Sequence, residues 1–160
     1  LTIHIVNIGN MLQMLRRKKR GPVRAKKTLV DGISFASGLE VYMYKALKEA
    51  NIQNQYEGKT FTLFPEFVFD KEAYERCANG KGEYKNRGNK KVLGIKYTPD
   101  FIGNNFIIEC KGRANDAFPL RWKMFKRFVH YHLQNTTLYK PQNQKECDMT
   151  ISLILEKTKI

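Results

Sequence analysis

Two neighbouring stretches decide the fold, Tyr97-Thr98-Pro99-Asp100-Phe101 and Phe106-Ile107-Ile108-Glu109-Cys110-Lys111-Gly112. Each contains a short apolar run bounded by proline or glycine, which is typical of a buried strand. The link Gly103-Asn104-Asn105 has the composition of a tight turn, so the two stretches are predicted to pair as a hairpin. A two-residue Asn104-Asn105 turn places Asp100 opposite Glu109, whereas a three-residue turn shifts the pairing by one residue and requires a bulge or twist.

Three ionisable side chains gather at the open end of this predicted hairpin. Because side chains alternate along a strand, Glu109 and Lys111 share one face and Cys110 takes the other. With the two-residue turn, Asp100 joins them, and the charged groups lie within about 5–8 Å of one another. Two carboxylates this close repel each other, and either a proton or a divalent cation relieves the repulsion.

A metal site is the functional interpretation of this pattern. Mg²⁺ prefers oxygen ligands, commonly one or two carboxylates together with water and substrate phosphate. The ammonium of Lys111 can balance charge, contact a phosphate or orient a water nucleophile. Together these residue types indicate metal-assisted hydrolysis of a phosphodiester.

The order Pro99-Asp100, then Glu109-Cys110-Lys111, resembles the signature of the PD-(D/E)xK nuclease superfamily. With Phe35-Ala36-Ser37-Gly38-Leu39-Glu40 upstream, it resembles the phage endonuclease I type of Holliday junction resolvase. The stretch 27–131 is also similar to a family of small phage proteins, with Val30-Asp31-Gly32-Ile33-Ser34-Phe35 at its start and the basic aromatic segment Leu120-Arg121-Trp122-Lys123-Met124-Phe125 after the lysine. The resemblance covers about two thirds of the chain and leaves out both termini.

The resemblance implies a restriction-endonuclease-like fold, an α/β core whose mixed central sheet is flanked by helices. It implies that Asp100, Glu109 and the backbone carbonyl of Cys110 hold one or two Mg²⁺ or Mn²⁺ ions, and that Lys111 positions or deprotonates the attacking water. Glu40 would complete the site, from the same chain or from the partner subunit of a homodimer. The implied substrate is branched DNA, and no organic cofactor is implied. If the protein is phage-encoded, the implied location is the cytoplasm of the bacterial host.

Glu40 also has a purely structural interpretation. A helix is predicted from Ser37 to about Asn51, because apolar residues repeat at helical spacing between them. Ser37 as N-cap, with Glu40 three residues later, forms a capping box, which needs no catalysis to explain it. The residues alone favour the cap, and the resemblance favours the metal site.

The charge of the chain indicates a polyanionic partner. Its 160 residues suffice for one domain, and 29 Lys+Arg against 15 Asp+Glu give a net charge of +14. Nucleic acid is favoured over a membrane because no amphipathic anchor accompanies this charge. The candidate DNA-binding residues lie in a basic N-terminal arm (1–28), in a basic insert (75–91) of the nuclease domain (29–160), and in a helix after the active site: Arg16, Arg17, Lys18, Lys19, Arg20; Lys81, Lys85, Arg87; Arg121, Lys123, Lys126, Arg127. For the arm and the insert, a merely solvated segment is the alternative.

The three cysteines, Cys77, Cys110 and Cys147, are widely spaced and form no CxxC pair, so disulfides are not expected and a reducing cytoplasm fits. A zinc site from Cys77, Cys147, His130 and His132 is an alternative whose spacing matches no common finger or ribbon.

The other expected elements follow from periodicity and from Pro and Gly positions. Pro119 is expected to start a helix with Trp122 in the core and an apolar stripe of Leu120, Met124, Phe128 and Tyr131. The segment from Tyr74 to Lys91 is expected to be a mobile loop, and 140–148 a polar connector. Strands are expected at Leu1–Ile8, Thr60–Phe64, Phe67–Phe69, Val92–Tyr97, Thr136–Tyr139 and Met149–Leu155.

Two other functions remain open. One is a nuclease or nickase acting on ordinary duplex or flapped DNA, because the N-terminal arm and the insert depart from the phage resolvase pattern. The other is a non-catalytic DNA-binding accessory protein of packaging or recombination, whose metal site is unused.

Overall fold

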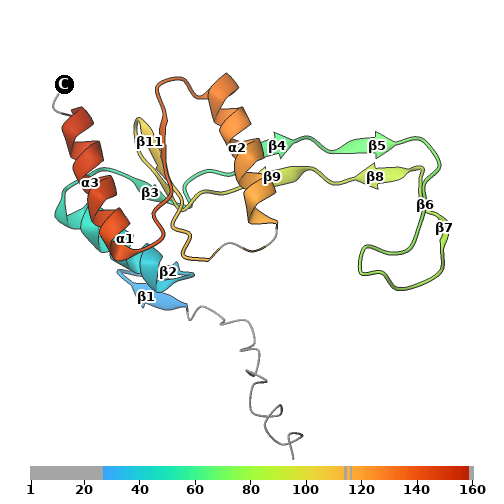
Figure 1. The fold of residues 1–160 in the computed structure, drawn as a ribbon, viewed down its shortest axis with the longest axis horizontal. Coiled ribbons are helices and arrows are strands. Elements are labelled where there is room, and N and C mark those ends of the chain that lie inside the picture. The colour runs from blue at the N-terminus through green and yellow to red at the C-terminus, as the bar shows by residue number, and fades with distance from the viewer. Residues whose placement is uncertain (1–26, 114, 116, 159–160) are drawn as a thin grey trace, which may run out of the picture.

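The computed structural model describes residues 27–113, 115 and 117–158 and combines helices with several small sheets (Figure 1). The strand expected at Leu1–Ile8 and the basic residues Arg16, Arg17, Lys18, Lys19 and Arg20 lie outside the described residues. In the described part of the chain, no helix is both long enough and apolar enough to cross a membrane.

A mixed four-stranded sheet forms the centre, in the order β12-β11-β10-β3. Its strands are β3 (Gln55–Tyr56), β10 (Phe101–Ile102), β11 (Phe106–Ile108) and β12 (Thr137–Tyr139). Strand β10 runs antiparallel to both β3 and β11, and β11 runs parallel to β12. The predicted mixed sheet is therefore confirmed.

Helices pack on both faces of this sheet. Phe106, Ile108 and Cys110 belong to the hydrophobic cluster that includes helices α1 (Gly38–Glu49) and α3 (Gln144–Thr158). Ile107, one residue out of phase, belongs to the second cluster, with helix α2 (Phe118–His132). Side chains that alternate along β11 therefore pack against helices on opposite faces of the sheet. Figure 1 shows α2 apart from the α1–α3 pair.

Helix α1 has well-defined ends. Ser37 is its N-cap and accepts from the N–H of Glu40. At the other end Asn51 has a φ of 54°, its N–H donates to the carbonyl of Lys48, and the N–H of Ile52 donates to that of Leu47. These two bonds form a Schellman motif with asparagine in the left-handed position, so the predicted end at Asn51 is confirmed. A hairpin not anticipated from the sequence, β1 (Thr28–Val30) and β2 (Ile33–Phe35), packs beside α1 and turns at Asp31-Gly32, both with positive φ.

Helix α2 begins where Pro119 predicts, and Trp122 is buried in the core as expected. The expected apolar stripe is wrong at its two ends, because Leu120 is 65% and Tyr131 is 62% exposed, whereas Met124 and Phe128 are half-buried. The buried side chains are Phe118, Trp122, Phe125 and Val129, which follow the helical spacing of four, three and four residues. The stripe chosen from the sequence had the right period but the wrong phase.

Helix α3 replaces the strand expected at Met149–Leu155, and its first residues, Gln144–Asp148, replace part of the expected connector. The apolar run favoured a strand, yet only Cys147, Thr150 and Ile154 are buried in this helix, at helical spacing. The helix opens with a cap that the sequence contained: Asn143 Oδ1 accepts from the N–H of Glu146, whose carboxylate accepts from the N–H of Gln142.

A long two-stranded ribbon projects from this body (Figure 1). It begins with β4 (Phe61–Phe64) on β9 (Ile95–Tyr97), continues with β5 (Phe67–Phe69) on β8 (Lys90–Val92) and ends with β6 (Tyr74–Glu75) on β7 (Lys85–Asn86). The strands expected at Thr60–Phe64 and Phe67–Phe69 are confirmed, whereas that expected at Val92–Tyr97 is divided at Leu93-Gly94.

The segment from Tyr74 to Lys91, expected to be a mobile loop, is irregular over 76–84 but also contains β6, β7 and the start of β8. Side chains fold this segment: Asn86 Oδ1 accepts from the N–H groups of Ala73 and Gly88, and Arg87 donates to the carbonyls of Glu75 and Glu83. Such side-chain bonds to the backbone leave no hydrophobic periodicity, so pattern analysis could not detect them.

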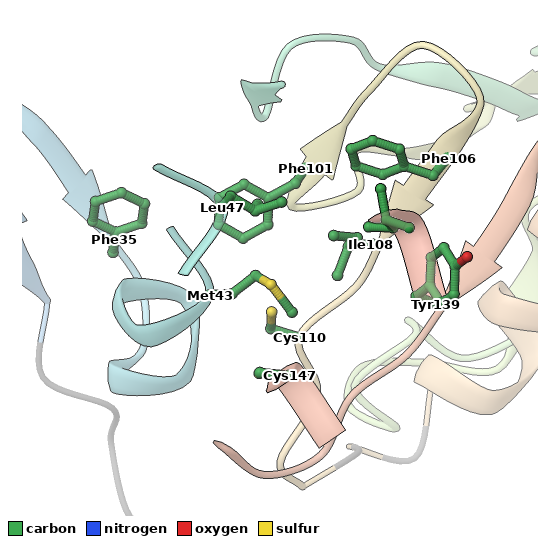
Figure 2. Close-up of a cluster of buried hydrophobic side chains, with 10 residues drawn as sticks. Phe35, Met43, Leu47, Phe101, Phe106, Ile108, Cys110, Tyr139 and Cys147 are labelled. Atoms are coloured by element: carbon green, nitrogen blue, oxygen red, sulfur yellow. The ribbon is translucent and has the colours of Figure 1, made fainter. Parts of the chain in front are cut away.

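The main core holds the hairpin β10–β11 from one side. Figure 2 shows Cys110 and Cys147 next to Met43, with Ile108 between this group and Tyr139. Met43 and Ile108 are fully buried, as is Phe101 on the neighbouring strand. Burying an apolar side chain of this size stabilises the fold by about 1.5–3 kcal/mol. The packing fixes the backbone on either side of Asp100 and Glu109.

Candidate active site

The register of β10 and β11 decides which residues meet at the end of the hairpin. Phe101 pairs with Ile108, and Ile102 pairs with Ile107. The N–H of Gly103 donates to the carbonyl of Phe106 at 2.9 Å, so the turn is the two-residue Asn104-Asn105. Continuing this register places Asp100 opposite Glu109, which is the arrangement expected for a two-residue turn and not that expected for a three-residue turn.

Asp100 is a partly buried carboxylate in an electrostatically unfavourable position. Its Oδ2 accepts from the N–H of Cys110 at 2.6 Å, and Oδ1 makes no hydrogen bond to any residue that the structure describes. Burial, and then the charges of Glu109 and Glu40, raise the pKa of Asp100 to about 8, against the opposing effects of the Cys110 N–H and Lys111. The carboxyl groups of residues 100, 109 and 40 are therefore close enough to repel one another.

Glu109 is 6% exposed and has two polar neighbours. The hydroxyl of Tyr97 donates to Oε2 at 2.7 Å, and the ammonium of Lys111 lies 3.9 Å from Oε1. Burial raises the pKa of Glu109, whereas the Tyr97 hydrogen bond and Lys111 oppose this rise. Burial, and then the charge of Glu109, raise the pKa of Tyr97, so its hydroxyl remains a donor. Tyr97 was not identified as a site residue, although it opens the decisive stretch of sequence.

Lys111 lies between Glu109 and the aromatic ring of Phe118. Its ammonium is 4.8 Å from the ring centroid, and the ammonium of Lys140 is 5.9 Å from the same centroid. Lys140 also opposes the raised pKa of Glu109. No sequence signal identified Lys140: it follows β12, and only the parallel pairing of Tyr139 with Ile108 brings it to this end of the sheet.

Cys110 contributes its backbone to the site and its side chain to the core, as the alternation predicted. Its thiol lies in the main hydrophobic cluster beside Cys147, and the hydrogen bond between the two thiols, with burial, raises the pKa of Cys110. The two buried thiols are free, and Cys77 is free and exposed, as expected.

Glu40 makes the contacts of the structural interpretation. Its Oε1 accepts from the Ser37 hydroxyl at 2.7 Å, and its Oε2 accepts from the Ala36 N–H at 3.0 Å and from the Tyr56 hydroxyl at 2.7 Å. Both oxygens are therefore engaged, and the side chain is 6% exposed. Its charge nevertheless acts on Asp100 and Glu109. A metal-binding role for Glu40 stays a prediction, and Tyr56 is a neighbour that the sequence did not reveal.

The donor chemistry fits a hard divalent cation. Between residues 27 and 158, with 114 and 116 set aside, no group of three or more His, Cys, Asp or Glu side chains is arranged to hold a metal ion. This finding covers the predicted set of Glu40, Asp100 and Glu109 as well as the zinc alternative. The zinc candidates are also far apart in the fold, since Cys147 is buried in α3, Cys77 lies in the ribbon and the two histidines end α2. Asp100 and Glu109 instead offer two carboxylates, which is the number with which Mg²⁺ is commonly bound.

The predicted DNA-binding residues have unequal surroundings. Arg121, Lys123, Lys126 and Arg127 are exposed on α2, the helix whose Phe118 ring contacts the Lys111 ammonium. In the ribbon, Lys81 and Lys85 are exposed, but the guanidinium of Arg87 is occupied by two backbone carbonyls. Lys90 and Lys91 form ion pairs with Glu75 and Glu66. Helix α2 is therefore the better positioned cationic surface.

Comparison with known proteins gives one match. The family model described as "Protein of unknown function (DUF1064)" matches residues 20–145, which include Glu40, Asp100, Glu109 and Lys111. Neither the curated proteins nor the solved structures yield a match.

Proposed function

The chain belongs to the DUF1064 family, and we propose that it is a divalent-metal-dependent endodeoxyribonuclease that hydrolyses phosphodiester bonds in branched DNA. One observation carries the proposal: Asp100 and Glu109 converge at the end of one hairpin, under mutual repulsion, with Lys111 beside them. A partly buried carboxylate whose pKa is raised to about 8 does not favour the folded state at neutral pH. Side chains with strongly shifted pKa values cluster at functional sites.

The architecture supports a restriction-endonuclease-like core as part of this proposal. A mixed sheet with helices on both faces carries the carboxylates on two adjacent strands, after a helix that carries Glu40. The carboxylates lie at strand ends, where backbone groups and side chains from several elements converge.

Each group at the site has a distinct role. Asp100, Glu109 and the backbone carbonyl of Cys110 would hold one or two Mg²⁺ or Mn²⁺ ions, which supply Lewis-acid stabilisation of phosphate charge and an activated water. The Cys110 N–H orients Asp100, and the Tyr97 hydroxyl orients Glu109. Lys111 holds positive charge where the phosphoryl oxygens gain negative charge, and positions the attacking water.

The cationic surroundings support a nucleic-acid substrate. Lys140 lies near the Phe118 ring that Lys111 also contacts, helix α2 carries four exposed cations, and the whole chain carries +14. Contacts to phosphates contribute binding affinity that does not depend on DNA sequence. A homodimer would present two such sites, which suits symmetric cutting of a four-way junction.

The decisive experiment compares a synthetic four-way junction with a linear duplex of the same sequence, in Mg²⁺, in Mn²⁺ and in a chelator. We expect metal-dependent cutting that favours the junction. Asp100→Asn and Lys111→Ala should each reduce cutting at least about 100-fold while DNA binding is retained. Asp70→Asn and Lys145→Ala, at exposed positions, are the matched controls.

Each other outcome has a defined meaning. Undiminished cutting by both Asp100→Asn and Lys111→Ala would refute the proposed centre. Equal cutting of junction and duplex would assign a nuclease or nickase of ordinary DNA instead of a resolvase. Tight DNA binding without cutting in either metal would assign a non-catalytic accessory protein.

A further inference from the structure

Lys140 lies beside Glu109 at the end of the central sheet. The parallel strands β11 and β12 pair Ile108 with Tyr139. This pairing continues past the strands, because the N–H of Glu109 donates to the carbonyl of Tyr139 at 3.0 Å, and the next such bond, from the N–H of Lys111, has the same length. Continuing the register by one residue places Lys140 next to Glu109, on the neighbouring strand's extension.

The side chains of Glu109 and Lys140 lie on the face of the sheet that α2 covers. Side chains alternate along a strand, and the residues two positions earlier, Ile107 and Leu138, are paired with each other and both pack in the hydrophobic cluster of α2. Asp100 lies opposite Glu109 on the other neighbouring strand. Glu109 is therefore the middle member of a row of three charged side chains, with a carboxylate on one side and an ammonium on the other.

The ammonium of Lys140 forms no ion pair with any residue that the structure describes. It lies 5.9 Å from the centroid of the Phe118 ring, and the ammonium of Lys111 lies 4.8 Å from the same centroid. An aromatic ring attracts cations over its face, but two ammonium groups held at one ring repel each other. Both lysines are only half-buried, so an anion from solution can reach them and relieve this repulsion.

The nature of that anion follows from the proposed function, on which this inference rests. The proposed mechanism assigns the scissile phosphate to the carboxylate pair and Lys111. Lys140 lies one strand farther from Asp100, and neighbouring strands are about 4.8 Å apart, so its charge falls beside the scissile phosphate. A DNA strand carries a negative phosphate at every nucleotide, and lysine is a common phosphate ligand.

We propose that Lys140 binds the DNA phosphate next to the scissile one. Lys111 and Lys140 would then contact two successive phosphates of the cut strand, one on each ammonium held at the Phe118 ring. The neighbouring phosphate keeps its charge throughout the reaction, so this contact is equally strong in the bound substrate and in the transition state. Lys140 therefore contributes to substrate binding and not to the chemical step.

The first test separates binding from chemistry. Lys140→Met removes the charge and keeps a long apolar side chain. On the synthetic four-way junction at saturating Mg²⁺, it should raise KM about five- to tenfold and change kcat less than about twofold. Lys140→Arg keeps the charge and should restore most of the affinity. Lys145→Met, at an exposed position of α3, is the matched control and should leave both constants unchanged.

The second test locates the contact on the DNA. A methylphosphonate replaces one charged phosphate oxygen by a methyl group, and a set of junctions carries it at one position at a time around the cut. Binding is measured in the Asp100→Asn background, so it does not require cutting. Next to the scissile phosphate, the methylphosphonate should weaken binding about five- to tenfold when Lys140 is present and have no effect in Lys140→Met. At more distant phosphates the two losses should add.

The outcomes distinguish this inference from the proposed function. If the natural chain cuts the junction, the role of Lys140 is overturned by an unchanged KM in Lys140→Met, by a lower kcat at unchanged KM, or by additive losses at both phosphates next to the cut. If the natural chain binds the junction but does not cut it in either metal, the nuclease is refuted. A non-additive loss at one phosphate would then still identify Lys140 as a phosphate ligand, and additive losses at every position would refute that contact as well.

Discussion

At the scale of single residues, Asp100 links the site to the stability of the protein. Its pKa of about 8 in the folded chain lies above its ordinary value of 3.8, so the folded state binds the proton more tightly than the unfolded state. The stabilising proton is bound at low pH and is lost as the pH rises from about 4 to about 8. Stability of the metal-free protein therefore falls across this window.

The first prediction follows from that sign. In the presence of a chelator, the melting temperature should fall between pH 5 and pH 8.5, and Asp100→Asn should flatten this fall because it removes the titrating group. Adding Mg²⁺ at pH 8 should raise the melting temperature of the natural chain and not that of Asp100→Asn, since a bound cation favours the ionised carboxylates. Calorimetric scans at several pH values measure both effects. A melting temperature that rises with pH in the chelator would contradict the raised pKa.

Tyr97 supports a second prediction at the same scale. Tyr97→Phe removes the hydrogen bond to Glu109 Oε2, leaves a buried acceptor unpaired and should destabilise the protein by about 1–3 kcal/mol. Because that bond holds the pKa of Glu109 down against burial, the acidic limb of the pH–rate profile for DNA cutting should move to higher pH. Tyr84→Phe, at an exposed tyrosine, should change neither quantity. A change in stability with an unmoved pH profile would limit Tyr97 to a structural role.

At the scale of elements, helix α2 packs against the side chains that position Glu109. Phe125 is fully buried, and its ring centroid lies 4.5 Å from that of Tyr97 and 5.4 Å from that of Phe61. Helix α2 therefore packs against Tyr97, whose hydroxyl donates to Glu109. The outer strands of the ribbon, β5 to β8, have no such role, because none of their residues belongs to either hydrophobic cluster.

A third prediction tests the phase of this helix. Phe125→Ala should destabilise the protein by about 3–5 kcal/mol, because it removes a buried ring and leaves a cavity. Leu120→Ala, on the stripe expected from the sequence but 65% exposed, should cost no more than about 0.5 kcal/mol. Urea denaturation of the two variants measures both values. A larger loss in Leu120→Ala than in Phe125→Ala would restore the stripe predicted from the sequence.

At the scale of the whole molecule, the net charge of +14 supports the proposed binding of DNA through its phosphates. Helix α2 packs on the side of the sheet that carries Glu109 and has four exposed cations, whereas the ribbon from 61 to 97 carries eight basic and five acidic side chains. Both segments therefore carry net positive charge, and comparing them experimentally shows which one contacts phosphates.

The fourth prediction is a change in salt dependence. Replacing Lys123 and Lys126 by glutamine should weaken binding to all DNA sequences alike, and should reduce the slope of log affinity against log salt by about one for each phosphate that the variant no longer neutralises. The matched control replaces Lys81 and Lys85 in the ribbon. Titrations over a range of salt concentrations measure the slopes. An unchanged slope in the α2 variant with a reduced slope in the ribbon variant would locate the DNA-binding surface in the ribbon.

What the sequence alone determined is local. A tight turn at 103–105, both ends of α1 and the start of α2 follow from turn residues, caps and alternation, which act within a few positions of the chain. The sequence left two turn lengths open, and the structure selected the two-residue turn that places Asp100 opposite Glu109. The tertiary structure decided the phase of α2, the helix at Gln144–Thr158, the folded ribbon, and the approach of Tyr97, Tyr56 and Lys140 to the acidic residues. These features depend on which face of each element packs against another element, and on contacts between residues far apart in sequence. Neither can be read from a local sequence pattern.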